Sequence, residues 1–124
     1  MTGLKEAVTG PKLLENIRAC FGSDRVLFSR HARDEMLTEE LGEIVEKEVF
    51  DAVLAGKLIE DYPADEPYPS CLIYGVTESR RPLHVVCAHA EDAQVAIVIT
   101  VYEPNPERWV DFERRYSTRC LQGS

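Results

Sequence analysis

The chain has 124 residues, of which 44% are hydrophobic and 29% are charged, and its formal net charge at pH 7 is −8. This length suits one domain with a single buried core, and the composition excludes a disordered or fibrous chain. A strongly acidic protein is also a poor non-specific ligand for nucleic acid, because it repels the phosphate backbone.

The negative charge is concentrated in the middle of the sequence. Residues 34–66 hold twelve acidic and two basic residues, whereas residues 1–33 hold six basic and three acidic ones. Residues 67–124 are nearly balanced, with seven acidic residues and six arginines. This separation leaves room for a local basic surface, although the total charge disfavours RNA as a partner.

No apolar run is long enough to span a bilayer, and the first residues do not show the basic and then apolar pattern of a signal peptide, so we expect none. We therefore expect a cytoplasmic protein with no membrane partner. The four cysteines, Cys20, Cys71, Cys87 and Cys120, include no C-x-x-C pair. We expect them to be buried free thiols rather than disulfides or a zinc site.

The predicted elements begin after ten frayed residues, with a helix that Pro11 opens and Gly22 ends. Residues 25–28 are short, apolar and β-prone, and predict a first strand. Ser29 is a good N-cap for a short helix over residues 31–37. Thr38 is expected to cap a longer helix that ends at Gly56.

This longer helix is predicted to be amphipathic. Its apolar stripe consists of Leu41, Ile44, Val45, Val49, Ala52 and Val53. Glu43, Glu46 and Asp51 lie mostly on the opposite side, which predicts an acidic exposed face.

The second half of the chain predicts strands over residues 57–62, 71–76, 82–90 and 95–102, followed by a short helix that begins near Glu107–Trp109. We expect one α+β domain over residues 11–118, with a tail over 119–124. In it, two to three helices pack on one face of a four-stranded, mainly antiparallel sheet.

The last two long strands are predicted to separate an apolar face from a polar one. A tight connection at residues 91–93 places Leu83, Val85 and Cys87 opposite Val101, Ile99 and Ile97 on the core face. The same register places His84 opposite Thr100 on the less covered face, near Tyr102. The polar face is therefore the candidate site.

The side chains near this face suit acid–base chemistry on a phosphate ester. His84 can act as an acid or base near neutral pH, and Tyr102 can donate a proton. Arg81 and Arg114 are candidate phosphate ligands. Trp109 either plugs the core edge or stacks on a base. Cross-strand packing of these polar residues is the simpler alternative.

His31 is a second candidate, one helical turn before Glu35. The pair suits an ordinary ion pair, an oriented imidazole or half of a metal site. The acidic residues of the proline-rich loop, Asp61, Asp65 and Glu66, match no calcium-loop spacing. We expect no resident metal and no cofactor.

Several segments together resemble a known family. They are FSRHARDEM, VLAGKLIEDYP, YPSCLIYG, RPLHVV and ITVYEPNPERW, which run from about Phe28 to Trp109. In them the chain resembles the domain-of-unknown-function family numbered 4258, which is usually grouped with RelE-like and BrnT-like toxins. The resemblance implies a RelE-like fold and a toxin of a type II toxin–antitoxin pair, with an antitoxin protein encoded nearby as partner.

The resemblance also implies a metal-independent endoribonuclease. By chemistry, His84 and Tyr102 would be its catalytic residues and His31 an alternative base. Arg81 and Arg114, with Thr100 and Trp109, would bind the substrate.

Two other hypotheses stay open. One is a non-catalytic protein-binding module of the same fold, whose acidic helix face and open sheet face receive a partner. The other is a metal-dependent hydrolase that uses His31, Glu35 and the loop acids.

Overall fold

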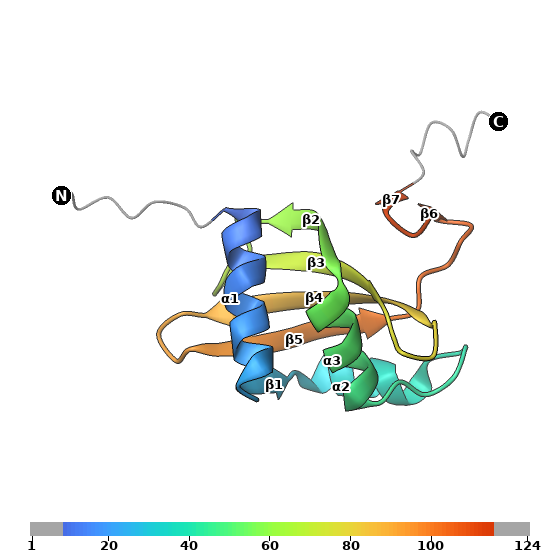
Figure 1. Cartoon of the computed structure of the whole chain (residues 1–124), viewed down its shortest axis with the longest axis horizontal. Helices are drawn as coiled ribbons and strands as arrows, with labels where there is room; N and C mark the ends of the chain where they lie inside the picture. The colour runs from blue at the N-terminus through green and yellow to red at the C-terminus, as the bar shows by residue number, and fades with distance from the viewer. Residues whose placement is uncertain (1–8, 116–124) are drawn as a thin grey trace.

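The computed structural model describes residues 9–115, which form helices, one main sheet and a small terminal hairpin (Figure 1). In chain order the elements are α1 (Gly10–Gly22), β1 (Val26–Phe28), α2 (Arg30–Thr38), α3 (Glu46–Ala55), β2 (Lys57–Tyr62), β3 (Ser70–Val76), β4 (Pro82–Ala90), β5 (Val95–Tyr102), β6 (Trp109–Val110) and β7 (Arg114–Arg115). Residues 1–8 of the expected frayed terminus, Cys120 and the expected tail over 119–124 lie outside the described residues. Within residues 9–115, no helix is long and apolar enough to cross a membrane.

The main sheet has five strands in the order β1-β5-β4-β3-β2. Strands β2 to β5 are antiparallel, and β1 pairs with β5 in parallel through residues 26–28 and 96–98. The α+β class with a mainly antiparallel sheet is confirmed, but the prediction of four strands is wrong. The short β1 segment occupies the outer edge of β5, because the chain returns along that edge between α1 and α2.

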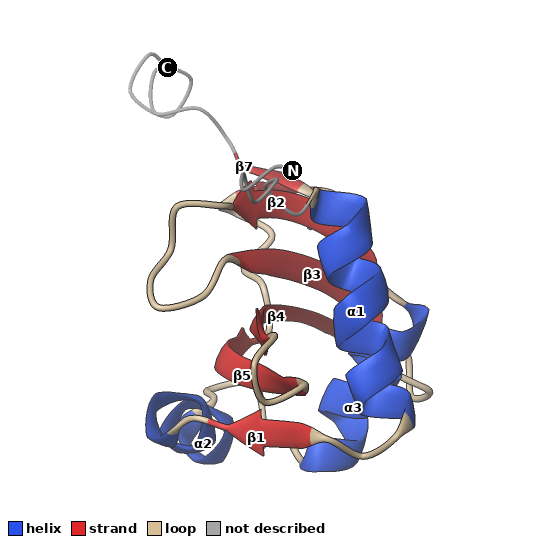
Figure 2. Cartoon of the chain, turned by 90° about the vertical axis from the view of Figure 1, so that its left-hand side faces the viewer, coloured by secondary structure: helices blue, strands red, loops and turns tan. Residues whose placement is uncertain are grey.

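Helices α1 and α3 lie side by side on one face of the sheet (Figure 2). Their apolar sides and the facing strand residues form the main core. Its strand members include Cys71, Ile73, Leu83, Val85, Cys87, Ala96, Val98 and Val101. Cys20, Cys71 and Cys87 are buried free thiols, as expected.

Helix α3 approaches β3 closely because glycine stands at the contact. A Cβ added at Gly75 would lie 1.9 Å from the carbonyl oxygen of Ala52, which is far inside van der Waals contact. The helix backbone can therefore rest directly on the strand only while position 75 lacks a side chain.

Helix α2 completes the hydrogen bonding of β5 beyond the end of β1. The Glu35 carboxylate accepts the backbone N–H of Val101 at 2.9 Å, and the Glu39 carboxylate accepts that of Glu103 at 3.0 Å. Two glutamate side chains thus take the place of a neighbouring strand at this edge, where backbone donors need partners.

The predicted start of the third helix is wrong. Thr38 ends α2, and α3 begins only at Glu46. A loop intervenes in which Gly42 has a φ of 120°, and the backbone N–H of Val45 is held by the Glu48 carboxylate at 3.0 Å. Three residues of the predicted apolar stripe, Leu41, Ile44 and Val45, fall in this loop. Only Ile44 is buried, because the chain there is not helical.

The pairing of β4 with β5 also differs from the expectation. The connection has four residues, 91–94, and an irregularity at Ile99 shifts the register, so His84 pairs with Tyr102 rather than with Thr100. This bulge reverses which residues face the helices in the first half of β5. Ala96 and Val98 are therefore buried in the core, and the predicted core positions Ile97 and Ile99 are only half-buried.

The predicted C-terminal helix is wrong as well. Strands β6 and β7 form a hairpin whose tip, Asp111 and Phe112, has φ values of 54° and 63°. Positive φ at both central residues is what a tight turn between twisted strands requires. This hairpin presents the Phe112 carbonyl to His84 of the sheet.

Candidate functional site

His84 lies at the centre of an aromatic cluster on the sheet face opposite α1 and α3. Its ring is fully buried, and its cross-strand neighbours are Tyr74 on β3 and Tyr102 on β5. The ring centroids of His84 and Trp109 are 4.4 Å apart and nearly perpendicular, so the indole covers the imidazole from the hairpin side. Sequence reasoning correctly predicted that His84 and Tyr102 share this face.

Both ring nitrogens of His84 have partners. Nε2 lies 2.6 Å from the Phe112 carbonyl oxygen, which can only accept, so Nε2 carries the proton. Nδ1 then accepts from the Tyr102 hydroxyl at 3.1 Å. This arrangement fixes a neutral imidazole in one tautomer.

The burial of the ring favours the same neutral form. Burial lowers the pKa of His84, and the hydrogen bond to the Phe112 carbonyl and the charge of Glu60 only partly oppose that shift. Burial also raises the pKa of Tyr102, so its hydroxyl stays protonated. The pair is stable as a neutral donor and a neutral acceptor.

A charged group borders this cluster at the hairpin. Arg115 stands over the Trp109 ring with its guanidinium carbon 4.7 Å from the centroid, and its Nε donates to Glu60 at 2.7 Å. The hydrogen bond from Arg115 lowers the pKa of Glu60, and burial raises the pKa of Tyr62 to about 12. Glu60 is therefore an ionised acceptor and Tyr62 a protonated donor, 2.5 Å apart.

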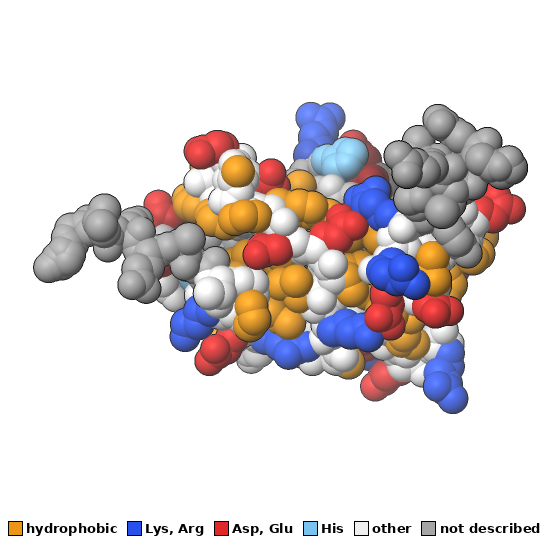
Figure 3. Space-filling view, turned by 90° about the horizontal axis from the view of Figure 1, so that it is seen from above, with side chains coloured by type: hydrophobic (Ala, Val, Ile, Leu, Met, Phe, Trp, Pro, Cys, Tyr) orange, Lys and Arg blue, Asp and Glu red, His pale blue; other side chains and the backbone are white. Residues whose placement is uncertain are grey.

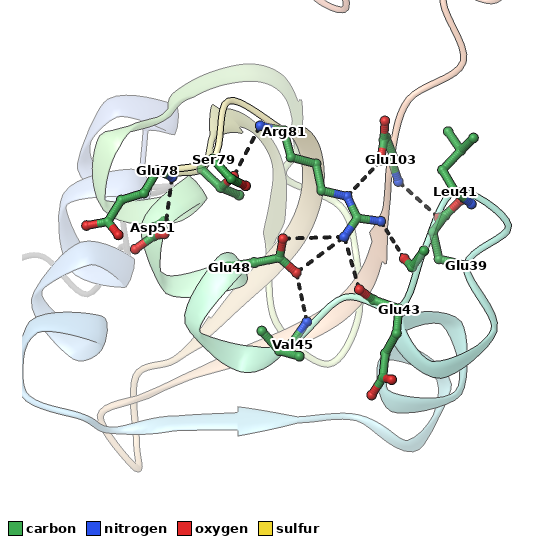
Figure 4. A network of polar contacts seen from close by, with 12 residues as sticks. Glu39, Leu41, Glu43, Val45, Glu48, Asp51, Glu78, Ser79, Arg81 and Glu103 are labelled. Carbon is green, nitrogen blue, oxygen red and sulfur yellow. Dashed lines mark hydrogen bonds and ion pairs between the residues drawn. The ribbon is translucent and has the colours of Figure 1, made fainter.

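Arg81 forms a second polar centre, between the β3–β4 turn and the loop before α3 (Figure 4). Its guanidinium donates to Glu103 at 2.7 Å, to Glu48 at 3.3 Å and to the Glu43 carbonyl at 3.0 Å. A further bond reaches the Gly42 carbonyl. The side chain is only 15% exposed, so its donors serve the fold.

One family model matches the chain, over residues 28–103, and its description is "Domain of unknown function (DUF4258)". The chain belongs to the DUF4258 family. No curated protein and no solved structure matches the sequence.

The DUF4258 match separates the two halves of the His84 cluster. His84 and Tyr102 lie inside the matched residues, as does Arg81, whereas Trp109 and Arg115 lie beyond them. The hairpin that covers the imidazole therefore lies outside the residues that match the DUF4258 model.

The remaining predicted site residues do not join the cluster. His31 on α2 is 66% exposed and pairs with Glu35 at 3.3 Å. Arg114 is exposed on β7, and Thr100 is half-buried two residues before Tyr102. Among the described residues, no group of three or more His, Cys, Asp or Glu side chains could hold a metal ion.

Sequence reasoning missed Glu60, Tyr62 and the Phe112 carbonyl. The alternation of Glu60 and Tyr62 along β2 carried a signal, because residues two apart share a sheet face. No local pattern could have indicated the Phe112 carbonyl, since it depends on a hairpin where a helix was predicted.

On the β2 edge of the molecule, the side chains of residues 9–115 form no continuous basic surface. Figure 3 shows basic, acidic and hydrophobic side chains interspersed over this face. An RNA backbone is bound by clustered Lys and Arg side chains, so the mixed charges on this face do not favour RNA binding.

Proposed function

We propose that this DUF4258 protein is a non-catalytic protein-binding module with a RelE/BrnT-like fold, which acts in the cytoplasm as one member of a two-protein pair encoded by adjacent genes. The observation that carries the proposal is that His84 is buried and hydrogen-bonded only to groups of this chain. Its side chain has no exposed surface, and both of its ring nitrogens are hydrogen-bonded within the molecule.

General acid–base catalysis requires a side chain that can exchange a proton with a substrate within hydrogen-bond distance. His84 could do so only after the Phe112 carbonyl or the Tyr102 hydroxyl had left it. Arg81, one of the two expected phosphate ligands, is already paired with Glu48 and Glu103, and the other, Arg114, is exposed on β7. The net charge of −8 further disfavours an RNA substrate.

The test is co-expression of the tagged chain with the product of the adjacent gene. We expect the two proteins to copurify in a fixed ratio, and we expect His84→Gln to copurify equally well. Cellular RNA should stay intact when the chain is expressed alone. Failure to form a complex, or RNA cleavage that depends on His84, would overturn the proposal.

A RelE-like endoribonuclease toxin is the second candidate. The observation that favours it is the contact of His84 with Tyr102 at 3.1 Å, beside Trp109 and Arg115, on the sheet face that α1 and α3 leave uncovered. Substrate could reach this group only if the β6–β7 hairpin moved away.

This candidate predicts growth arrest on expression and relief by the adjacent gene product. Tyr102→Phe should abolish the arrest, whereas Tyr68→Phe, at a half-buried loop tyrosine whose hydroxyl donates to Asp92, should not. Normal growth with intact RNA would remove the candidate.

A further inference from the structure

A shallow apolar groove lies between α2 and the loop that leads into α3. Its volume is about 280 Å³, and its lining consists of Arg33, Met36, Leu37, Glu43, Ile44, Val45 and Glu46. This volume is below the range typical of small-molecule sites, so the groove suits side chains inserted by another protein better than a cofactor.

Large apolar side chains stand exposed in and beside this groove. Leu37 is 65% exposed and Val45 is 48% exposed, and both line it. Leu41, in the same loop, is 62% exposed. A group of exposed aliphatic side chains with polar residues around it is typical of a binding surface.

The loop that carries these side chains is fixed in place. Arg81 donates to the carbonyls of Gly42 and Glu43 (Figure 4), and the Ile44 side chain is buried beside the core. The backbone N–H of Ile44 also donates to Met36 at 2.9 Å. The apolar groups are thus presented by a preformed surface, which lowers the entropic cost of binding.

Acidic groups are in excess at the groove: Arg33 and Glu46 of its lining form an ion pair with each other at 3.2 Å, which leaves the Glu43 carboxylate as the unbalanced charge of the lining. Figure 4 shows the Glu43 carboxylate pointing away from Arg81, and Asp34 lies one helical turn before Leu37. Among the described residues, neither of these carboxylates forms an ion pair, and neither does that of exposed Glu40. A second copy of the chain would bring the same negative charge to this face, which disfavours self-association.

We propose that this groove binds a basic amphipathic helix of the partner protein. Apolar residues at positions i, i+3 or i+4, and i+7 would contact Leu37, Val45 and the groove floor. Lys or Arg residues on the flanks would pair with Asp34 and Glu43. This inference rests on the proposed function, since it names the surface and the chemistry of the protein partner.

The probe is a fluorescent synthetic peptide of about 18 residues, made of Leu and Lys in helical amphipathic order and long enough to be helical when bound. Its control is a peptide of the same composition in scrambled order. We expect saturable binding of the ordered peptide alone, weakened at high salt because exposed charges are screened.

Variants of the groove identify the surface. Leu37→Ser and Val45→Ser should each raise the Kd by about tenfold, since each removes one buried aliphatic contact. Glu43→Lys should raise it by a similar factor at low salt only. The matched controls are Leu54→Ser and Glu107→Lys, at exposed positions outside the groove, which should leave the Kd within about twofold.

Equal binding of the ordered and scrambled peptides, or equal effects of groove and control variants, overturns the proposal. So does a concentration-dependent dimer that Leu37→Ser dissociates, since a second copy would then be the occupant. If the adjacent gene product copurifies with the double variant Leu37→Ser, Glu43→Lys as with wild type, the groove proposal fails and the proposed function stands. If it fails to copurify with wild type, the proposed function itself fails.

Discussion

Arg81→Met is expected to destabilise the fold strongly, although Arg81 lies in a surface turn. The guanidinium is 15% exposed, and its carboxylate partners Glu48 and Glu103 are 20% and 19% exposed. Removal of the guanidinium leaves two half-buried carboxylates and two backbone carbonyls without their donor.

The expected loss can be bounded from both sides. Exposed ion pairs contribute about 0–1 kcal/mol, and removal of one partner of a fully buried pair costs about 3–5 kcal/mol. The exposure of Arg81 and its partners lies between these two cases. The charged guanidinium also donates several hydrogen bonds, and all of them are lost in Arg81→Met. We therefore expect a loss of about 2–3 kcal/mol in the free energy of unfolding, or a Tm lower by about 10 °C for a domain of this size.

Urea unfolding followed by circular dichroism measures this loss. The matched control is Arg33→Met, which breaks the ion pair with Glu46 whose side chains are 56% and 54% exposed, and which should cost at most about 1 kcal/mol. Adding Glu103→Gln to Arg81→Met should recover about 1 kcal/mol, because an unpaired charge disappears. A loss for Arg81→Met no larger than that for Arg33→Met would refute this account of the network.

Three further predictions concern the core and the His84 cluster. Because burial lowers the pKa of His84, the unfolded chain takes up its proton first as pH falls below about 6.5, and this contribution to stability declines from there through the folded-state pKa. His84→Gln should therefore flatten the stability profile between pH 7 and 5, and a profile parallel to wild type would contradict the buried neutral imidazole. Tyr102→Phe should cost about 1–2 kcal/mol in urea unfolding because it leaves a buried ring nitrogen without a donor, and a neutral effect would mean that the 3.1 Å contact is not a hydrogen bond. Gly75→Ala should cost about 3 kcal/mol or more in the free energy of unfolding, because the added Cβ collides with the α3 backbone. The control is Gly22→Ala, whose added Cβ meets nothing within 4 Å and which should be neutral or stabilising. Equal effects of the two substitutions would refute the close helix–strand contact.

Local sequence patterns predicted most strands of the main sheet, because the residues that indicate a strand lie within the strand or directly beside it. Alternating apolar residues and flanking turn residues give β4 and β5 their observed bounds, 82–90 and 95–102. The helical periodicity after Thr38 was misleading. Gly42 at positive φ and the non-local bonds from Arg81 override the helical pattern, and no local signal reports such bonds.

The candidate site was predicted in its centre but not in its surroundings. Strand alternation predicted that His84 and Tyr102 lie on one face. The observed pairing in that part of the sheet is shifted by two residues from the predicted one, and a shift of two leaves every side chain on the same face. Burial of the imidazole depends on the β6–β7 hairpin, where two residues with positive φ replace the expected helix. Burial decides whether the histidine is reactive, and it is set by tertiary contacts far along the chain.

The glutamate side chains of α2 that bond to β5 have a consequence for self-assembly. An unpaired strand edge is a template on which another chain can add, and many proteins aggregate by that route. Here Glu35 and Glu39 occupy the donors of β5 that β1 is too short to reach. A further strand cannot pair with this part of β5 while the two side chains occupy its donors. A change that unwinds α2 would expose these donors and favour the addition of strands from other chains at this edge.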